Sequence, residues 1–219
     1  MKKLRTIIRW VIWTIAGLYI TTIVLLHIPA VQGFLAQKVG DVAGNKLGTE
    51  VHVGRIDLGF INRFVLDDIL IYDQSHKKML SASRVGARVD IWHLLRTGEI
   101  NISSAQLFGL RAELYKTSKD AKPNFQFVLD SLASKDTTSH TPLHLSINSL
   151  VIRHGSIKYD CLDAPTTPNR LNLNHINVSD ISSYLILNKL DDTSVWADLR
   201  ALAFKEASGL EVKQLAFEL

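Results

Sequence analysis

Residues 102–115 read ISSAQLFGLRAELY, and residues 147–159 read INSLVIRHGSIKY. In each segment apolar residues alternate with polar ones, which is the period of a β-strand. The parity of the alternation changes around Phe108-Gly109, so we expect a bulge or bend there. The two segments have the same form and indicate an internal repeat, with a weaker third copy beginning at Leu173. Such a repeat favours an elongated stack of strands over a closed globule.

The same period continues on both sides of this repeat. It is visible over residues 51–71 and 85–91, and again over residues 171–178 and 210–219. The last run reaches Leu219 without a turn signal, which suggests the front part of a longer chain, although a natural edge strand at this point is the alternative. The body is therefore predicted to be mainly β.

Helices are expected at a few places in this body. Residues 91–96 form one short helical turn before Gly98, and a second short helix follows Asn124, whose side chain is suited to an N-cap. Residues 31–47 carry apolar side chains at helical spacing. Gly40 and Gly44 weaken that helix, so we expect the side of the helix that carries them to pack closely on neighbouring structure. We also expect the helix to lie near a membrane surface.

The amino terminus predicts a membrane anchor. Four basic residues, Lys2, Lys3, Arg5 and Arg9, precede a segment from 10 to 27 that has no charged side chain. As a helix this segment is about 27 Å long, close to the thickness of the hydrocarbon layer. The basic residues place the amino terminus in the cytoplasm and the body across the membrane. A cleaved signal peptide is the alternative, but the apolar run is long and Ile28-Pro29-Ala30 is a poor cleavage site.

The predicted organisation has five parts. Residues 1–29 form the transmembrane anchor, and residues 30–48 form the short amphipathic helix. Residues 49–133 form a first β-segment. A polar linker over residues 134–142 leads to a second β-segment over residues 143–219, which the strand pattern predicts to be truncated.

Charge and cysteine content narrow the function classes. The chain has 25 basic and 21 acidic residues, and four of the basic ones flank the anchor, so the body holds 25 − 4 = 21 basic against 21 acidic. A neutral body without a basic cluster does not predict a nucleic-acid partner. The single cysteine, Cys161, excludes an intramolecular disulfide and is expected to be buried.

No combination of residues requires an enzyme. His140 and His144 are separated by Pro142 in the polar linker, so they do not share a helical face and no metal site is expected. Asp67-Asp68 and Asp191-Asp192 are adjacent pairs whose side chains point to opposite faces of a strand. Motifs for nucleophilic hydrolysis, nucleotide binding and zinc catalysis are missing from the sequence, and no cofactor is predicted.

The apolar alternation is the remaining functional signal. It has two interpretations: an ordinary sandwich core, or one face of a curved open sheet that acyl chains can reach. The candidate lipid-binding residues are Ile100, Ile102, Leu107, Leu145, Ile147, Ile152, Leu171 and Leu173.

Residues 89–115 resemble the amino-terminal region of the AsmA-like superfamily. The stretch LLRTG at 94–98 leads into strands, a kink at Gly109, a further strand and a short helix opened by Asn124, which is the order in that family. The anchor, the first helix and the strand from Val51 to Ile56 also fit. The match covers nearly the whole chain, but members of the family with this start are several times longer.

The resemblance implies an elongated open β-groove built from a repeating curved sheet, held in the inner membrane and reaching into the periplasm. Its implied function is to bind phospholipid acyl chains for transport between membranes. The alternative is an assembly factor for outer-membrane β-barrel proteins that works with an Omp85-type barrel and does not transfer lipid. With this resemblance, the groove becomes the favoured interpretation of the apolar alternation.

Overall fold

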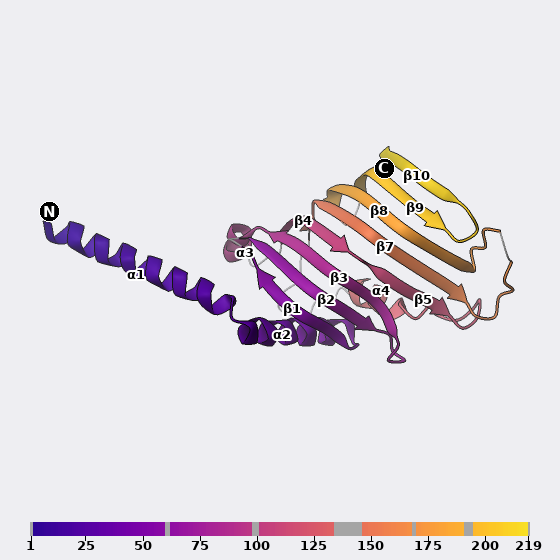
Figure 1. Cartoon of the computed structure of the whole chain (residues 1–219), viewed down its shortest axis with the longest axis horizontal. Coiled ribbons are helices and arrows are strands. Elements are labelled where there is room, and N and C mark those ends of the chain that lie inside the picture. Colours follow the sequence, from indigo (N-terminus) through magenta and orange to yellow (C-terminus); the bar gives the residue numbers. More distant parts are fainter. Residues whose placement is uncertain are drawn as a thin grey trace.

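The computed structural model describes residues 2–59, 62–97, 101–133, 146–167, 170–190 and 195–218 of the chain (Figure 1). Its helices are α1 (Lys2–Leu26), α2 (Pro29–Leu47), α3 (Ile91–Thr97) and α4 (Gln126–Ala133). Its strands are β1 (Val51–Leu58), β2 (Arg63–Tyr72), β3 (Lys78–Val89), β4 (Asn101–Phe108), β5 (Arg111–Lys116), β6 (Ser146–Ile147), β7 (Ser149–Cys161), β8 (His175–Leu190), β9 (Val195–Glu206) and β10 (Glu211–Glu218). The prediction of a mainly β body behind an apolar amino-terminal helix is confirmed.

Helix α1 projects away from the sheet (Figure 1). Its segment from Thr6 to Leu26 has 21 residues with a mean hydropathy of 1.7, and none of its most apolar window is buried in the protein. A helix of this length and composition can cross a membrane.

Helix α2 begins at Pro29, in the first turn, where proline costs no hydrogen bond. It ends at Gly48, which adopts the left-handed conformation and donates its N–H to the Gly44 carbonyl. A methyl group on Gly40 would lie 2.8 Å from the Val51 carbonyl oxygen of β1, and one on Gly44 would lie 2.7 Å from that of Thr49. The expectation that these glycines allow close packing is confirmed.

The buried hydrophobic cluster of the described residues joins α2 to the first three strands. Its members are Ala36 of α2, Val53 and Ile56 of β1, Ile69 of β2 and Ala82 of β3. These side chains leave water on the one face of the sheet that α2 covers, which is the main stabilising contribution at this end of the molecule.

One sheet contains all the described strands. Its main path runs β1-β2-β3-β4-β7-β8-β9-β10, with β5 between β3 and β7 beyond the end of β4, and β6 beside β4. Neighbouring strands are antiparallel except where β4 meets β6 and β7, and where β5 meets β7. Parallel neighbours need a crossover connection, and α4 lies in that connection.

The two similar segments lie side by side in this parallel region. Ile102 pairs with Ile147, Leu107 with Ile152 and Ala112 with Ile157, so the offset stays at 45 residues along both segments. The predicted third copy does not continue this arrangement, because β8 runs antiparallel to β7 and Leu173 lies before it begins.

A row of left-handed residues crosses the middle of the sheet. Asp68 in β2, Gly109 between β4 and β5, His154 in β7 and Asp180 in β8 all have φ between 53° and 62°. The predicted bend at Phe108-Gly109 is one member of this row. At each kink the alternation of side chains changes parity, which lets the same face stay apolar on both sides.

Asn124 does not act as the predicted N-cap of the second short helix. Its side-chain oxygen accepts the Tyr115 N–H, and its amide group donates to the Glu113 carbonyl. The amide group also lies 3.5 Å from the Asp73 carboxylate. Asn124 therefore ties the residues before α4 to β5.

The close approach of α2 to β1 predicts opposite effects for two substitutions. Gly40→Ala should destabilise the protein by about 1–3 kcal/mol, because the added methyl group meets a backbone oxygen that cannot move away alone. Gly33→Ala, in the same helix with nothing within 4 Å of the added group, should be neutral or stabilising by up to about 1 kcal/mol. Thermal unfolding of the detergent-solubilised chain by circular dichroism measures both. Equal melting temperatures for the two variants would contradict the packing.

Candidate functional site

Two rows of paired residues cross the sheet on the face that α2 covers. One row consists, from β1 to β10, of Ile56, Leu66, Val85, Leu107, Ile152, Ser183, Leu202 and Leu215. The second row consists, from β2 to β10, of Phe64, Ala87, Ala105, Leu150, Leu185, Leu199 and Phe217. Residues paired directly across strands share a face. We call this surface the apolar face; Ser183 is the one polar residue in the two rows.

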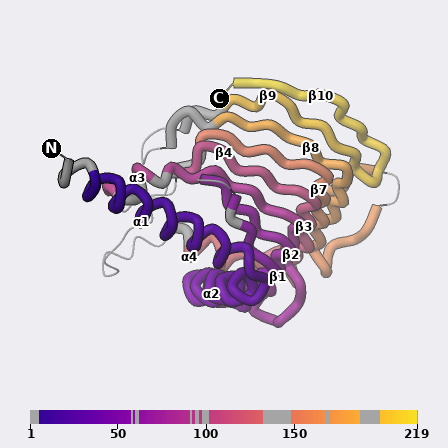
Figure 2. Tube along the Cα trace, turned by 60° about the vertical axis from the view of Figure 1, so that its left-hand side comes forward, coloured from indigo at the N-terminus to yellow at the C-terminus, as the bar shows by residue number. Residues whose placement is uncertain are grey.

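Burial on the apolar face is uneven: Leu199 of β9 is 9 % exposed, but the edge strand β10 is more open. Ile56 is only 5 % exposed beneath α2, whereas Leu107 and Ile152 in the middle are half-buried. Leu215 and Phe217 on β10 are both 43 % exposed. Figure 2 shows why: α2 and α4 lie on one side of the sheet toward its β1 end, while β7 to β10 extend beyond them. The helices therefore cover the apolar face only in part.

The opposite face carries ion pairs, together with some apolar residues such as Val65 and Val151. Asp67 of β2 lies between two arginines, with Arg84 Nε at 2.7 Å and Arg55 Nη2 at 2.6 Å from its carboxylate oxygens. The hydrogen bond from Arg84, with that from Arg55, holds the pKa of Asp67 below its usual value in spite of burial. Gln106 and Arg153, next in sequence to Leu107 and Ile152, are exposed. The two faces thus differ in chemistry, as an open amphipathic sheet requires.

Two of the predicted lipid-binding residues lie in the rows of the apolar face: Leu107 and Ile152 are half-buried in β4 and β7. Ile102, also half-buried in β4, pairs with Val89 of β3 outside these rows. Ile147 pairs with Ile102 through the backbone. Ile100 and Leu145 fall outside the described residues.

Leu171 and Leu173 differ from the expectation. They were predicted in a strand, but β8 begins only at His175, and both lie in the preceding loop, 53 % and 73 % exposed. The His175 N–H donates to the Asn172 carbonyl and closes a turn. Leu173 lies inside this turn and Leu171 lies before it, so neither is part of β8.

Sequence reasoning missed part of the apolar face. Leu150, Leu185, Leu199, Leu202, Leu215 and Phe217 belong to its rows, although none was selected. Leu199 and Leu202 of β9 lie three residues apart, across a register shift against β10, so a strict period of two does not connect these two residues.

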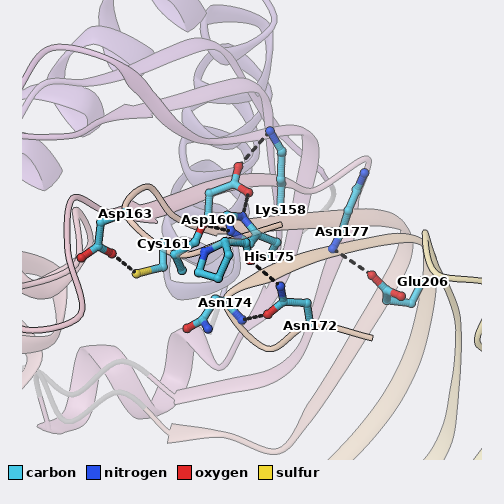
Figure 3. A network of polar contacts seen from close by, with 11 residues as sticks. Lys158, Asp160, Cys161, Asp163, Asn172, Asn174, His175, Asn177 and Glu206 are labelled. Atoms are coloured by element: carbon cyan, nitrogen blue, oxygen red, sulfur yellow. Dashed lines mark hydrogen bonds and ion pairs between the residues drawn. The ribbon is translucent and has the colours of Figure 1, made fainter. Parts of the chain in front are cut away.

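A polar network fixes the loop between β7 and β8 (Figure 3). His175 Nδ1 lies 3.0 Å from the Asp160 carboxylate, and His175 Nε2 lies 3.0 Å from the Ala164 carbonyl oxygen. Lys158 pairs with the other carboxylate oxygen of Asp160 at 2.9 Å. Below the loop, Cys161 is fully buried, as predicted, with its thiol 3.0 Å from the Asp163 carboxylate.

Both partners of the His175 ring accept hydrogen bonds and cannot donate. Each ring nitrogen must therefore carry a proton for both contacts to form, which requires the imidazolium. The hydrogen bond to Asp160 is the main cause that raises the pKa of His175, followed by the bond to the Ala164 carbonyl. The protonated ring holds the turn after β7 against the start of β8.

Metal ligands and reactive thiols are two kinds of catalytic group that can be checked in the described residues. They contain no group of three or more histidine, cysteine, aspartate or glutamate side chains that could hold a metal ion. The pKa of Cys161 is raised by its hydrogen bond to Asp163, which makes the thiol less nucleophilic. His140 and His144 fall outside the described residues. The chemistry that the arrangement can provide is the burial of apolar ligand surface.

The His175 contacts predict that the loop loosens as pH rises. Because the pKa of His175 is raised on folding, its contribution is fully present below the unfolded pKa and is lost as pH rises through the folded pKa. Alkylation of Cys161, divided by the rate for the unfolded chain at the same pH, measures this opening. Protection should fall as the pH rises above 6.5, the usual pKa of histidine. The profile should flatten in His175→Gln and stay unchanged in His52→Gln, an exposed histidine on β1. A wild-type profile without pH dependence would contradict the assignment.

Comparison with known proteins identified no relative of this chain. No protein-family model, no curated protein and no solved structure is significantly similar to the chain. The proposals below therefore depend on the residues of this chain, and above all on the apolar face.

Proposed function

We propose that this chain is a membrane-anchored, AsmA-like envelope protein that binds the acyl chains of phospholipids on its apolar face. The order of its elements is most similar to the start of the translocation and assembly module subunit TamB. In this proposal α1 crosses the inner membrane and the sheet lies in the periplasm. Phospholipid moves between membranes along the open face, and no covalent step is needed.

The observation that carries the proposal is the continuity of the apolar rows beyond the helices. The rows begin under α2 and reach β10, where Leu215 and Phe217 are 43 % exposed. A contiguous apolar surface that the protein leaves partly open is typical of a binding surface. Burying an acyl chain stabilises it by about 0.8 kcal/mol per CH₂ group, so a few methylene groups on this face suffice for binding.

The same face argues against the simpler alternative, an ordinary sandwich core. A sandwich needs a second layer packed over the whole sheet. All the described strands belong to one sheet, and the described hydrophobic cluster is confined to α2 and β1 to β3. A bound lipid would supply the missing layer over β4 to β10.

A second candidate function follows from the edge of the sheet. In the described part of the chain β10 pairs only with β9, so its outer backbone groups are available to another strand. Strand addition at such an edge is a common mode of recognition. It would suit an assembly factor for outer-membrane β-barrel proteins that acts with an Omp85-type partner. Co-isolation of a barrel protein with lipid-free chain would favour this function over lipid binding.

Charged substitutions on the apolar face test lipid binding. Leu107→Glu and Ile152→Glu place carboxylates on two directly paired residues in the middle of the face. On an open face the carboxylate can reach water, so the chain should stay folded by circular dichroism while co-purifying phospholipid falls at least about tenfold.

The matched controls are their neighbours in sequence on the polar face. Gln106→Glu adds the same charge as the test variants, and Arg153→Glu changes the charge by one unit more; both positions are exposed, and both variants should keep their lipid. Unfolding of both Leu107→Glu and Ile152→Glu would indicate a closed core. Retained phospholipid in folded variants would place the binding surface elsewhere.

The proposed topology is tested by a compartment-sensitive reporter fused after Leu219. In the parent the reporter should be active only on the periplasmic side. Neutral replacements of Lys2, Lys3, Arg5 and Arg9 should reduce or scramble this orientation, because these charges hold the amino terminus in the cytoplasm. Reporter activity in the cytoplasm of the parent would show that the assigned orientation is wrong.

A further inference from the structure

Trp92 is an unusually exposed aromatic residue. Its side chain, in the first turn of α3, is 75 % exposed, slightly more than Trp10 at 71 % and Trp13 at 70 % in the apolar helix α1. A tryptophan ring that stays in water contributes no burial energy to the fold. Such exposure is therefore a sign of an interaction surface.

The position of Trp92 is held by the helix itself. The Asp90 carboxylate accepts the His93 N–H at 3.0 Å, which caps α3 at its start. The Thr97 hydroxyl donates to the His93 carbonyl at 2.9 Å near its end. Arg96 in the last turn is exposed. Helix α3 as a whole, Ile91 to Thr97, contains three aliphatic residues, one tryptophan and one arginine.

Helix α3 lies at the end of the sheet from which α1 projects. Both Figure 1 and Figure 2 place α3 on the side of the sheet from which α1 projects. Only two residues, His27 and Ile28, separate α1 from α2, and the Gln32 side chain donates to the Leu26 carbonyl across this junction at 3.2 Å. The surface of a membrane crossed by α1 would therefore lie near α3.

We propose that α3 is a second membrane contact, with the Trp92 indole in the headgroup region of the bilayer that α1 crosses. Tryptophan is enriched at this depth because its ring is apolar and its N–H can meet the headgroups. Arg96 can extend toward lipid phosphates from the same short helix. Two contacts, α1 and α3, would fix the orientation of the sheet relative to the bilayer, which one flexible anchor does not. The inference rests on the membrane anchoring in the proposed function.

The experiment uses the full chain in phosphatidylcholine vesicles, with Cys161→Ala as background so that single cysteines can carry the environment-sensitive fluorophore NBD. Trp92→Cys reports on α3. Ile15→Cys reports on the middle of α1 and is read in a second set of vesicles that carry the nitroxide on the phospholipid acyl chain, because the middle of the bilayer is about 15 Å from the headgroups. Leu173→Cys is the matched water control: it is 73 % exposed, in the loop after β7. Because β4 follows α3 and β7 runs parallel to β4, that loop lies at the opposite end of the strands.

Vesicles that contain phospholipid with a nitroxide near the headgroup should quench the label at position 92 about twofold relative to vesicles without it, and leave the label at position 173 unchanged. Equal, negligible quenching at positions 92 and 173, with clear quenching at position 15, would overturn the α3 contact and leave the anchor intact. A label at position 92 that is shielded from water but not quenched would indicate a protein partner or a second copy, and would also overturn it. Loss of quenching at position 15 would overturn the anchor itself, and the α3 contact with it.

Discussion

The structure depends on a sheet whose apolar face is wider than the helices that cover it. Packing of α2 on β1 removes Val53, Ile56 and Ala36 from water, and this buried cluster organises the first strands. Farther along the same rows, the side chains of β4 to β10 are mostly half-buried or exposed. The unburied part of the face is a free-energy cost that a bound apolar ligand would offset, and the proposed lipid binding follows from this imbalance.

Left-handed residues recur where the apolar face changes parity. Asp68 of β2, Gly109 between β4 and β5, His154 of β7 and Asp180 of β8 adopt this conformation, whereas β3 has no such residue. At these four positions a change of parity keeps apolar side chains on the same face. At Gly109 an added methyl group would lie 2.5 Å from the Ser83 hydroxyl, so both conformation and space favour glycine there.

The polar features complement this face. The ion pairs of Arg55 and Arg84 with Asp67 lie on the opposite face of the sheet. The His175 network fixes the loop that carries Leu171 and Leu173. With α1 and the proposed contact of α3 at one end, the sheet would be oriented with one face toward lipid and the other toward solvent. Binding by such a surface is passive, because it requires only the transfer of acyl chains from water to an apolar surface.

The sequence by itself determined the local elements: the apolar helix α1, α2 with its close-packing glycines, the short helix α3, the period of the strands and the bend at Gly109. Each depends on neighbours within a few residues, which propensity and periodicity can read. Tertiary structure decided what those elements do together. It paired Leu107 with Ile152 across 45 residues and redirected Asn124 from its own helix to β5. It also left Leu171 and Leu173 in a loop, and joined Leu199, Leu215 and Phe217 to the apolar face through register shifts. These outcomes depend on which strands become neighbours, and contacts between residues far apart in the chain set that order.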